Sequence, residues 1–224
     1  PSVRSDYNYS YINLESVNTI SIKKLDLKSR VFGQWGHGNF PLESRLYLAG
    51  ANPEELLENR FTRAAGFVPS EWASYTGSIN HFQYGGGLNL RGYAGYIAPE
   101  VIKLDNGNDT LLFAFAGKAG ASWSGELDFD KLINIPAKGI TKNFHLDTYL
   151  FSDLGFIAFD VNNKLKAGSF RMDAGIGTAL TFKFSPYDIN PITLRFDVPL
   201  FLNRPPFDQE YFDFRYVVGI KRSF

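Results

Sequence analysis

The sequence predicts an all-β fold, a transmembrane antiparallel β-barrel of which about seven strands lie in this chain. Several stretches alternate between apolar and polar residues with a period of two, which indicates strands with two different environments. The composition also favours strands and chain bends, because Phe, Tyr and Gly number 21, 12 and 21. No run of about 18 apolar residues occurs, so we expect no transmembrane helix, whereas transmembrane strands need no such run. Residues 1–224 are therefore expected to belong to one barrel domain.

Charge and cysteine content exclude several classes of protein. The 23 basic and 23 acidic residues give a formal net charge of +0, which does not support a nucleic-acid partner. Cysteine is absent, so disulfides and thiolate metal sites are excluded. The chain starts at Pro1 without a signal-peptide pattern, and we therefore expect a mature or truncated product.

The end of the chain shows the clearest alternation. Even positions from Phe212 to Phe224 are mostly apolar or aromatic, and odd positions are mostly polar or small. We interpret this segment as the terminal strand of the barrel. Its signal residues are Tyr216, Val218, Gly219, Ile220 and Phe224.

Six earlier stretches alternate in the same way, around residues 7–11, 25–35, 110–123, 144–156, 170–184 and 192–200. Most of them exceed the usual strand length of about five or six residues and suit a bilayer. Charged side chains such as Arg171, Asp173 and Arg195 share one face. A soluble sandwich would turn that face to water, whereas a membrane barrel would turn it to a polar lumen. Alternation alone fits both.

The predicted connections differ in length. A short turn is expected at 185–191, and longer polar connections around 160–168 and 203–210. One connection, from about residue 36 to 109, is exceptional, and connections this long are usually functional. Within it, Asn52 followed by Pro53, Glu54 and Glu55 predicts the start of a helix that reaches about Arg63.

Four segments together resemble one superfamily of outer-membrane proteins. They are Gly85-Gly86-Gly87-Leu88-Asn89-Leu90-Arg91-Gly92-Tyr93, Phe151-Ser152-Asp153-Leu154-Gly155, Asp173-Ala174-Gly175-Ile176-Gly177, and Leu194 to Leu200 before the final strand. Their order and spacing are similar to those of the bacterial surface antigen superfamily, which includes the barrel-assembly protein and the two-partner secretion translocases. The resemblance covers roughly residues 25–224 and implies the C-terminal strands of a 16-stranded barrel in the bacterial outer membrane.

The resemblance also implies a lock between the long loop and the wall inside the lumen. Arg91, followed by Gly92 and Tyr93, docks onto Asp153 of the strand that continues to Gly155. The residues alone support this pair, because Asp153 lies on the polar face of its strand and a guanidinium binds a carboxylate bidentately. The alternative is an Arg91 at a solvated loop tip. Gly85, Gly86 and Gly87 would let the loop turn tightly.

At one position the sequence departs from the family pattern. Asp173 stands where the family often has a small residue, so the surroundings of the lumen differ there.

The function implied by the resemblance is the insertion or export of proteins without catalysis. Substrate strands would pair with the terminal strand at a weak seam, or an unfolded chain would pass the lumen once the loop moves. The expected partners are outer-membrane lipid, a substrate polypeptide or accessory subunits, and the upstream half of the barrel on the same or another chain. Seven is an odd number and an open edge in lipid is costly, so further strands must complete the barrel.

We expect no catalytic site, no cofactor and no metal site. The histidines His37, His81 and His145 are scattered, and no nucleophile elbow or phosphate loop follows the glycines. His145 and Asp147 share a face and are interpreted as a hydrogen-bonded pair. Three other interpretations remain open: a barrel that anchors an upstream hydrolase domain, a passive porin-like channel, and a soluble β-sandwich.

Overall fold

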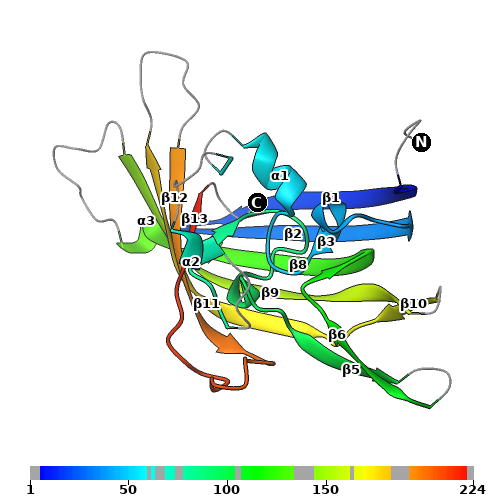
Figure 1. The fold of residues 1–224 in the computed structure, drawn as a ribbon. Helices are drawn as coiled ribbons and strands as arrows, with labels where there is room; N and C mark the ends of the chain where they lie inside the picture. Colours follow the sequence, from blue (N-terminus) through cyan, green and yellow to red (C-terminus); the bar gives the residue numbers. More distant parts are fainter. Residues whose placement is uncertain are drawn as a thin grey trace.

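The computed structural model describes residues 6–59, 62–63, 69–73, 78–103, 107–133, 144–161, 164–182 and 192–220. Most of these residues form strands, and the largest sheet curls into a half-barrel (Figure 1). None of the helices in the described part of the chain has the length and apolar character of a transmembrane helix. The all-β prediction is thus confirmed.

Seven strands form the wall of the half-barrel. In spatial order they are β1 (Tyr9–Ile22), β2 (Leu25–Gly38), β8 (Ala119–Asp128), β9 (Phe144–Val161), β11 (Arg171–Phe182), β12 (Ile192–Leu202) and β13 (Val217–Ile220). Each neighbouring pair is antiparallel. Because six such pairings separate β1 from β13, these two strands run in the same direction. A short strand, β10 (Lys164–Ala167), folds back on the end of β9.

One predicted strand is wrong. The stretch 110–123 contains the end of a separate hairpin, β5 (Pro99–Lys103) with β6 (Asp109–Phe113), and only then the start of β8. Between them Ala114 and Phe115 bond backbone groups of the loop rather than the wall. The alternation continues in phase across both elements, which is why it suggested one strand. The long connection therefore runs from Asn39 to Lys118, beyond its predicted end at residue 109.

The terminal strand begins later than predicted. Residues 213–216 are not in the ladder, and Phe212 makes only an isolated bridge to Phe201. At this interruption the guanidinium of Arg215 turns back to the Gln209 side chain, 2.6 Å away, and to the carbonyl of Glu210. The predicted signal residue Phe224 and the predicted turn 185–191 lie outside the described residues.

The long loop folds on itself within the curl of the sheet (Figure 1). Its elements are η1 (Leu42–Ser44), β3 (Leu46–Tyr47), α1 (Pro53–Glu58), α2 (Ser70–Ala73), β4 (Phe82–Tyr84), η2 (Arg91–Tyr93), β5, β6 and β7 (Ala116–Gly117). Helix α1 starts as predicted, with a capping box between Asn52 and Glu55. It ends at Glu58, short of the predicted Arg63, because Asn59 is extended. A further short helix, α3 (Asp130–Ile133), follows β8.

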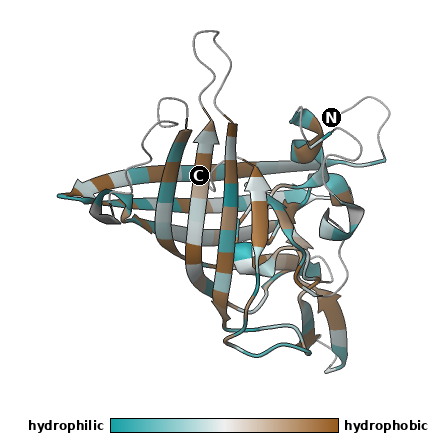
Figure 2. Ribbon diagram, turned by 90° about the vertical axis from the view of Figure 1, so that its left-hand side faces the viewer, coloured by the Kyte–Doolittle hydropathy of each residue, from teal (hydrophilic) through white to brown (hydrophobic). Residues whose placement is uncertain are grey.

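The two faces of the curled sheet have opposite character. Figure 2 shows hydrophobic and hydrophilic residues in alternating bands along the strands. Large apolar side chains of the wall are exposed on the outer face: Leu27, Val31, Trp35, Trp123, Phe144, Leu146, Leu150, Phe156, Ile176, Leu194, Phe196 and Leu200. Charged side chains are buried on the inner face, against the loop: Arg30, Glu126, Asp128, Asp153, Arg171, Asp173, Arg195 and Asp197. Buried charged side chains in this number, and large apolar side chains exposed on the opposite face, are both unusual in a water-soluble domain.

Candidate functional site

Arg91 lies in η2 of the loop and is completely buried against the wall. Its Nε and Nη2 donate to the two carboxylate oxygens of Asp153, at 2.7 and 2.8 Å, and its Nη1 donates to Glu126 at 2.7 Å. Asp153 lies on β9 and Glu126 on the neighbouring β8, where both side chains face the loop. The predicted contact between Arg91 and Asp153 is thus present, with bidentate geometry.

The charge of Arg91 is held in a dry environment. Its guanidinium carbon lies 4.1 Å from the centre of the Phe151 ring, which is two residues from Asp153 on the same face of β9. Burial alone would lower the pKa of Arg91, but the charges of Asp153, Glu126 and Asp197 hold that pKa well above its ordinary value. Arg91 is therefore charged, and its contact with Asp153 and Glu126 is an ion pair.

Gly92 docks beside Arg91 and contacts a second carboxylate. Its backbone N–H donates to Asp173 Oδ2 at 3.1 Å. A Cβ at this position would lie 2.4 Å from Leu202 and 2.8 Å from Asp173, so no other residue fits without movement of the wall. Asp173 lies directly opposite Asp153 on the neighbouring strand. Facing carboxylates repel, and the loop supplies a donor to each of them. Asp173 therefore belongs to the docking site.

Tyr93 connects the loop to the segment that follows β12. The buried ring packs in the main apolar core, and its hydroxyl donates to Asn203 Oδ1 at 2.7 Å. The same hydroxyl oxygen accepts the backbone N–H of Arg204 at 3.3 Å. Three consecutive loop residues thus contact three different parts of the wall.

A second ion pair extends the cluster along β12. Arg195 Nε lies 2.9 Å from Asp197 Oδ2, and the Tyr149 hydroxyl donates to Asp197 Oδ1 at 2.7 Å. Asp197 Oδ1 is also 4.0 Å from Arg91 Nη1. Four buried carboxyl groups thus lie around Arg91 and Arg195: Glu126, Asp153, Asp173 and Asp197. The wall is therefore acidic at this point, and Arg91 supplies one of the two positive charges that face these carboxyl groups.

The other predicted motif residues shape the backbone. Gly87 has φ of +54°, and a Cβ there would lie 2.7 Å from the Tyr47 carbonyl oxygen, so this turn requires glycine. Gly85 and Gly86 line the same turn. Gly155 lies in β9, where a Cβ would meet the Ala121 carbonyl oxygen at 2.6 Å, so it permits close contact with β8 rather than with the loop.

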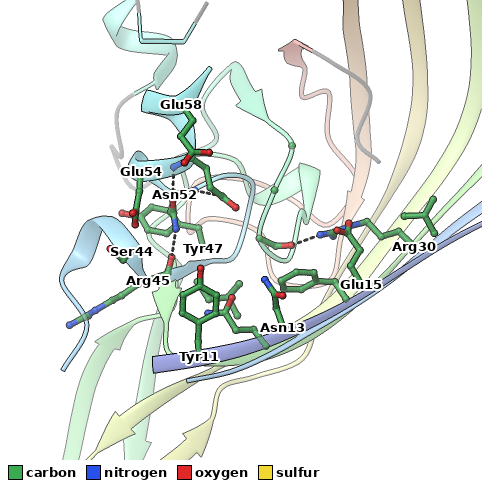
Figure 3. Close-up of a pocket in the computed structure, with 18 residues that line it drawn as sticks. Tyr11, Asn13, Glu15, Arg30, Ser44, Arg45, Tyr47, Asn52, Glu54 and Glu58 are labelled. Carbon is green, nitrogen blue, oxygen red and sulfur yellow. Dashed lines mark hydrogen bonds and ion pairs between the residues drawn. The ribbon is translucent and has the colours of Figure 1, made fainter. Parts of the chain in front are cut away.

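A polar cavity of about 550 Å³ separates the loop from the first two strands. Figure 3 shows Glu15 and Arg30 of the wall on one side and Asn52, Glu54 and Glu58 on the other. Arg30 Nε pairs with Glu15 at 2.5 Å, and Arg30 Nη2 donates to the Gly87 carbonyl at 2.9 Å. Burial raises the pKa of Glu55, which also lines this cavity.

Several site residues were missed from the sequence. Glu126 was missed because the predicted strand ended at residue 123, and its signal was the continued alternation through Asp128. Asp197 stood inside the fourth motif segment but without an assigned partner. Arg195 was placed on the polar face of its strand but without a partner. The contacts of Tyr149 and Gln83 were not predicted, because their partners lie 48 and 112 residues away in the sequence.

Two sets of expected residues lie apart from the Arg91 cluster. Tyr216, Val218, Gly219 and Ile220 are in or beside β13 at the end of the wall. His145 and Asp147 pair at 2.9 Å near the start of β9, as their shared face indicated. Asp130 brings a third potential metal ligand to this pair, with the ligand atoms within 4.8 Å of one another.

Comparisons with family models, curated proteins and solved structures found none that matches this chain.

Proposed function

We propose that this chain is the C-terminal part of a bacterial outer-membrane barrel that inserts or exports proteins without catalysis. The observation that carries the proposal is the inverted sheet, with its charged face buried against the loop and its apolar face exposed. Outer-membrane barrels have this distribution, because lipid covers their outer face and their interior is polar.

The extent of the apolar face supports lipid as its partner. Twelve large apolar side chains are exposed on five adjacent strands, β2, β8, β9, β11 and β12. Soluble monomers rarely expose contiguous apolar patches larger than a few hundred Å². Burial of such a face in a bilayer removes it from water, and the strands need no further partner on that side.

Strand direction supports completion of the barrel by other strands. Because β1 and β13 run in the same direction, these seven strands cannot close as an antiparallel barrel. Within the described part of the chain no strand pairs with the outer edge of β1, which is 14 residues long. Unpaired backbone groups in lipid cost on the order of several kcal/mol each. An odd number of additional strands, upstream or on another chain, would satisfy both edges.

The docked loop supports a role in protein movement rather than catalysis. Arg91, Gly92 and Tyr93 hold the loop across the inner face of the wall. An unfolded polypeptide passes through the lumen only if this loop moves, and a substrate strand at the edge of β13 pairs by β-augmentation. In both routes the chain binds and guides protein through backbone contacts.

The test uses the full-length protein, extracted with detergent and run on semi-native gels with and without boiling. Wild type is expected to migrate as a compact form that boiling abolishes. Arg91→Ala is expected to lose this form at lower temperature and to lower the amount of folded outer-membrane protein or exported polypeptide in cells that carry only the variant. Arg63→Ala removes an exposed arginine of the same loop and is the matched control. A wild-type protein that is soluble without detergent and shows no shift refutes the proposal.

A passive channel is the second candidate, and the polar cavity favours it. Its 550 Å³ lie between the wall and α1, beside the docked part of the loop, and have room for water and small ions. Planar-bilayer recordings separate the two functions. A large conductance that is the same in wild type and Arg91→Ala supports the channel, whereas a conductance that rises when Arg91 is removed supports a loop that closes a protein-sized lumen.

A further inference from the structure

The terminal strand has a second neighbour in addition to β12. Residues Phe82–Tyr84 of the loop form β4, which pairs with β13 in the register Val218 with Phe82 and Ile220 with Tyr84. This pairing is parallel, whereas all neighbouring wall strands are antiparallel. The edge of β13 at which the half-barrel ends is therefore occupied by a segment of the chain's own loop.

Side chains make this contact specific. The His81 ring stacks on Tyr216, with ring centres 3.9 Å apart and planes 4° from parallel, and Trp72 meets both rings edge-on. Arg195 Nη2 donates to Gln83 Oε1 at 2.6 Å. A Cβ on Gly219 would lie 2.9 Å from the Gln83 carbonyl oxygen, so the absence of a side chain at Gly219 leaves room for β4.

The occupied edge and the Arg91 cluster belong to one unit of the loop. The Asn80 N–H donates to the Ala94 carbonyl at 2.8 Å, which links the start of β4 to the end of η2. Arg195 contacts Gln83 of β4 and also pairs with Asp197, which lies 4.0 Å from Arg91. Movement of one part of the loop therefore disturbs the other.

We propose that β4 is a displaceable occupant of the closing edge, and that an incoming β-strand pairs with β13 only after β4 has left. This inference rests on the proposed function. One edge of a strand bonds a single neighbour, so β4 and an incoming strand compete directly. The strand that closes an antiparallel barrel must run opposite to β13, so β4, which runs parallel, cannot serve as that strand.

The geometry also favours exchange. The ladder between β4 and β13 contains three residue pairs, and parallel pairing is slightly less stable per residue than antiparallel pairing. An extended segment with a longer antiparallel register would form more bonds with the same edge. The partner that fits is an unfolded polypeptide with a segment that alternates between apolar and polar residues, because the strands of the wall beside which it would lie show the same alternation.

The test is a reversible disulfide in the full-length protein in outer-membrane vesicles. Phe82→Cys with Val218→Cys places two thiols on directly paired residues, within the range that a disulfide bridges. The control is Thr181→Cys with Thr193→Cys, because these hydroxyls lie 2.9 Å apart across β11 and β12, two strands that stay paired. The thiols are oxidised first, and an unfolded outer-membrane protein is then added. Dithiothreitol reduces the disulfide again.

Both pairs are expected to crosslink. The β4–β13 crosslink is expected to reduce insertion or export about tenfold, with recovery on reduction, and the control crosslink to leave it unchanged. A control that crosslinks while the β4–β13 pair does not would show that β4 is absent from the edge and would overturn the inference. A complete β4–β13 crosslink without effect on active protein would also overturn it.

Failure of the proposed function is a separate outcome. Wild-type protein that neither inserts nor exports polypeptides refutes that function before any crosslink is made. The crosslinking yield still decides whether β4 occupies the edge of β13 in the full-length protein.

Discussion

Arg91 and Arg30 both connect the long loop to the wall, and their surroundings differ. Arg91 reaches from the loop into the wall. Arg91 and its acidic partners Asp153 and Glu126 are all completely buried. Arg30 reaches from the wall to the Gly87 carbonyl of the loop and pairs with Glu15, whose side chain is 50% exposed at the cavity. The chemistry is the same, but water reaches the partner of Arg30, whereas it does not reach the partners of Arg91.

This difference teaches which side of the loop can move. On the Arg91 side every charged group depends on protein partners, so undocking leaves buried charges without compensation. On the Arg30 side the cavity already contains space for water, and separation of the loop from the wall exposes groups that water can solvate. We infer that the loop opens first from the cavity and last from the Arg91 cluster.

The largest effect is expected for Arg91→Ala. Removal of one partner of a buried ion pair costs about 3–5 kcal/mol, and here two carboxylates lose their counter-charge. The temperature at which the compact gel form disappears should fall sharply, and a protease should cleave the loop. Arg63→Ala should match wild type in both measurements. A stable, protease-resistant Arg91→Ala protein would show that the ion pair does not hold the loop.

The charge exchange Arg91→Asp with Asp153→Arg should restore only part of this loss. A new pair forms between residues 91 and 153, but the aspartate at 91 would then face Glu126 and Asp197, which still carry negative charge. The double variant should therefore lie between wild type and either single variant in the same gel assay. A double variant no better than the worse single variant would argue against a direct interaction.

Gly92→Ala is expected to have an intermediate effect. The added methyl would overlap Leu202 and Asp173, and overpacking of this kind costs about 1–3 kcal/mol. Gly33→Ala is the control, because the nearest atom to its added Cβ is a carbonyl oxygen 4.0 Å away. Gel stability and loop proteolysis should change for Gly92→Ala alone. Equal stability of the two variants would mean that the docked contact is looser than described.

The sequence predicts features that depend on residues close together in the chain, and it does not predict contacts between short segments that are far apart. The strands follow from period-two alternation, which is readable along the chain. The contact of Arg91 with Asp153 was expected from the resemblance of the four segments to a known superfamily and from the position of Asp153 on the polar face of its strand. Residues 110–123 were assigned to one strand because alternation cannot register that Ala114 and Phe115 turn away to bond the loop. The pairing of β4 with β13 joins segments about 135 residues apart, and a three-residue strand has no measurable period.

The smallest effect is expected for Glu15→Gln. This change removes the charge that faces Arg30 but keeps the shape and a hydrogen-bond acceptor, and the side chain of Glu15 is half exposed to water. Because Arg30 still donates to the Gly87 carbonyl, the loop should stay docked, and gel stability should match wild type. Ion selectivity in bilayer recordings should shift toward anions, because the cavity loses a negative charge. A large loss of stability would instead mean that the cavity side of the loop is held as tightly as the Arg91 side, and the inferred order of opening would be wrong.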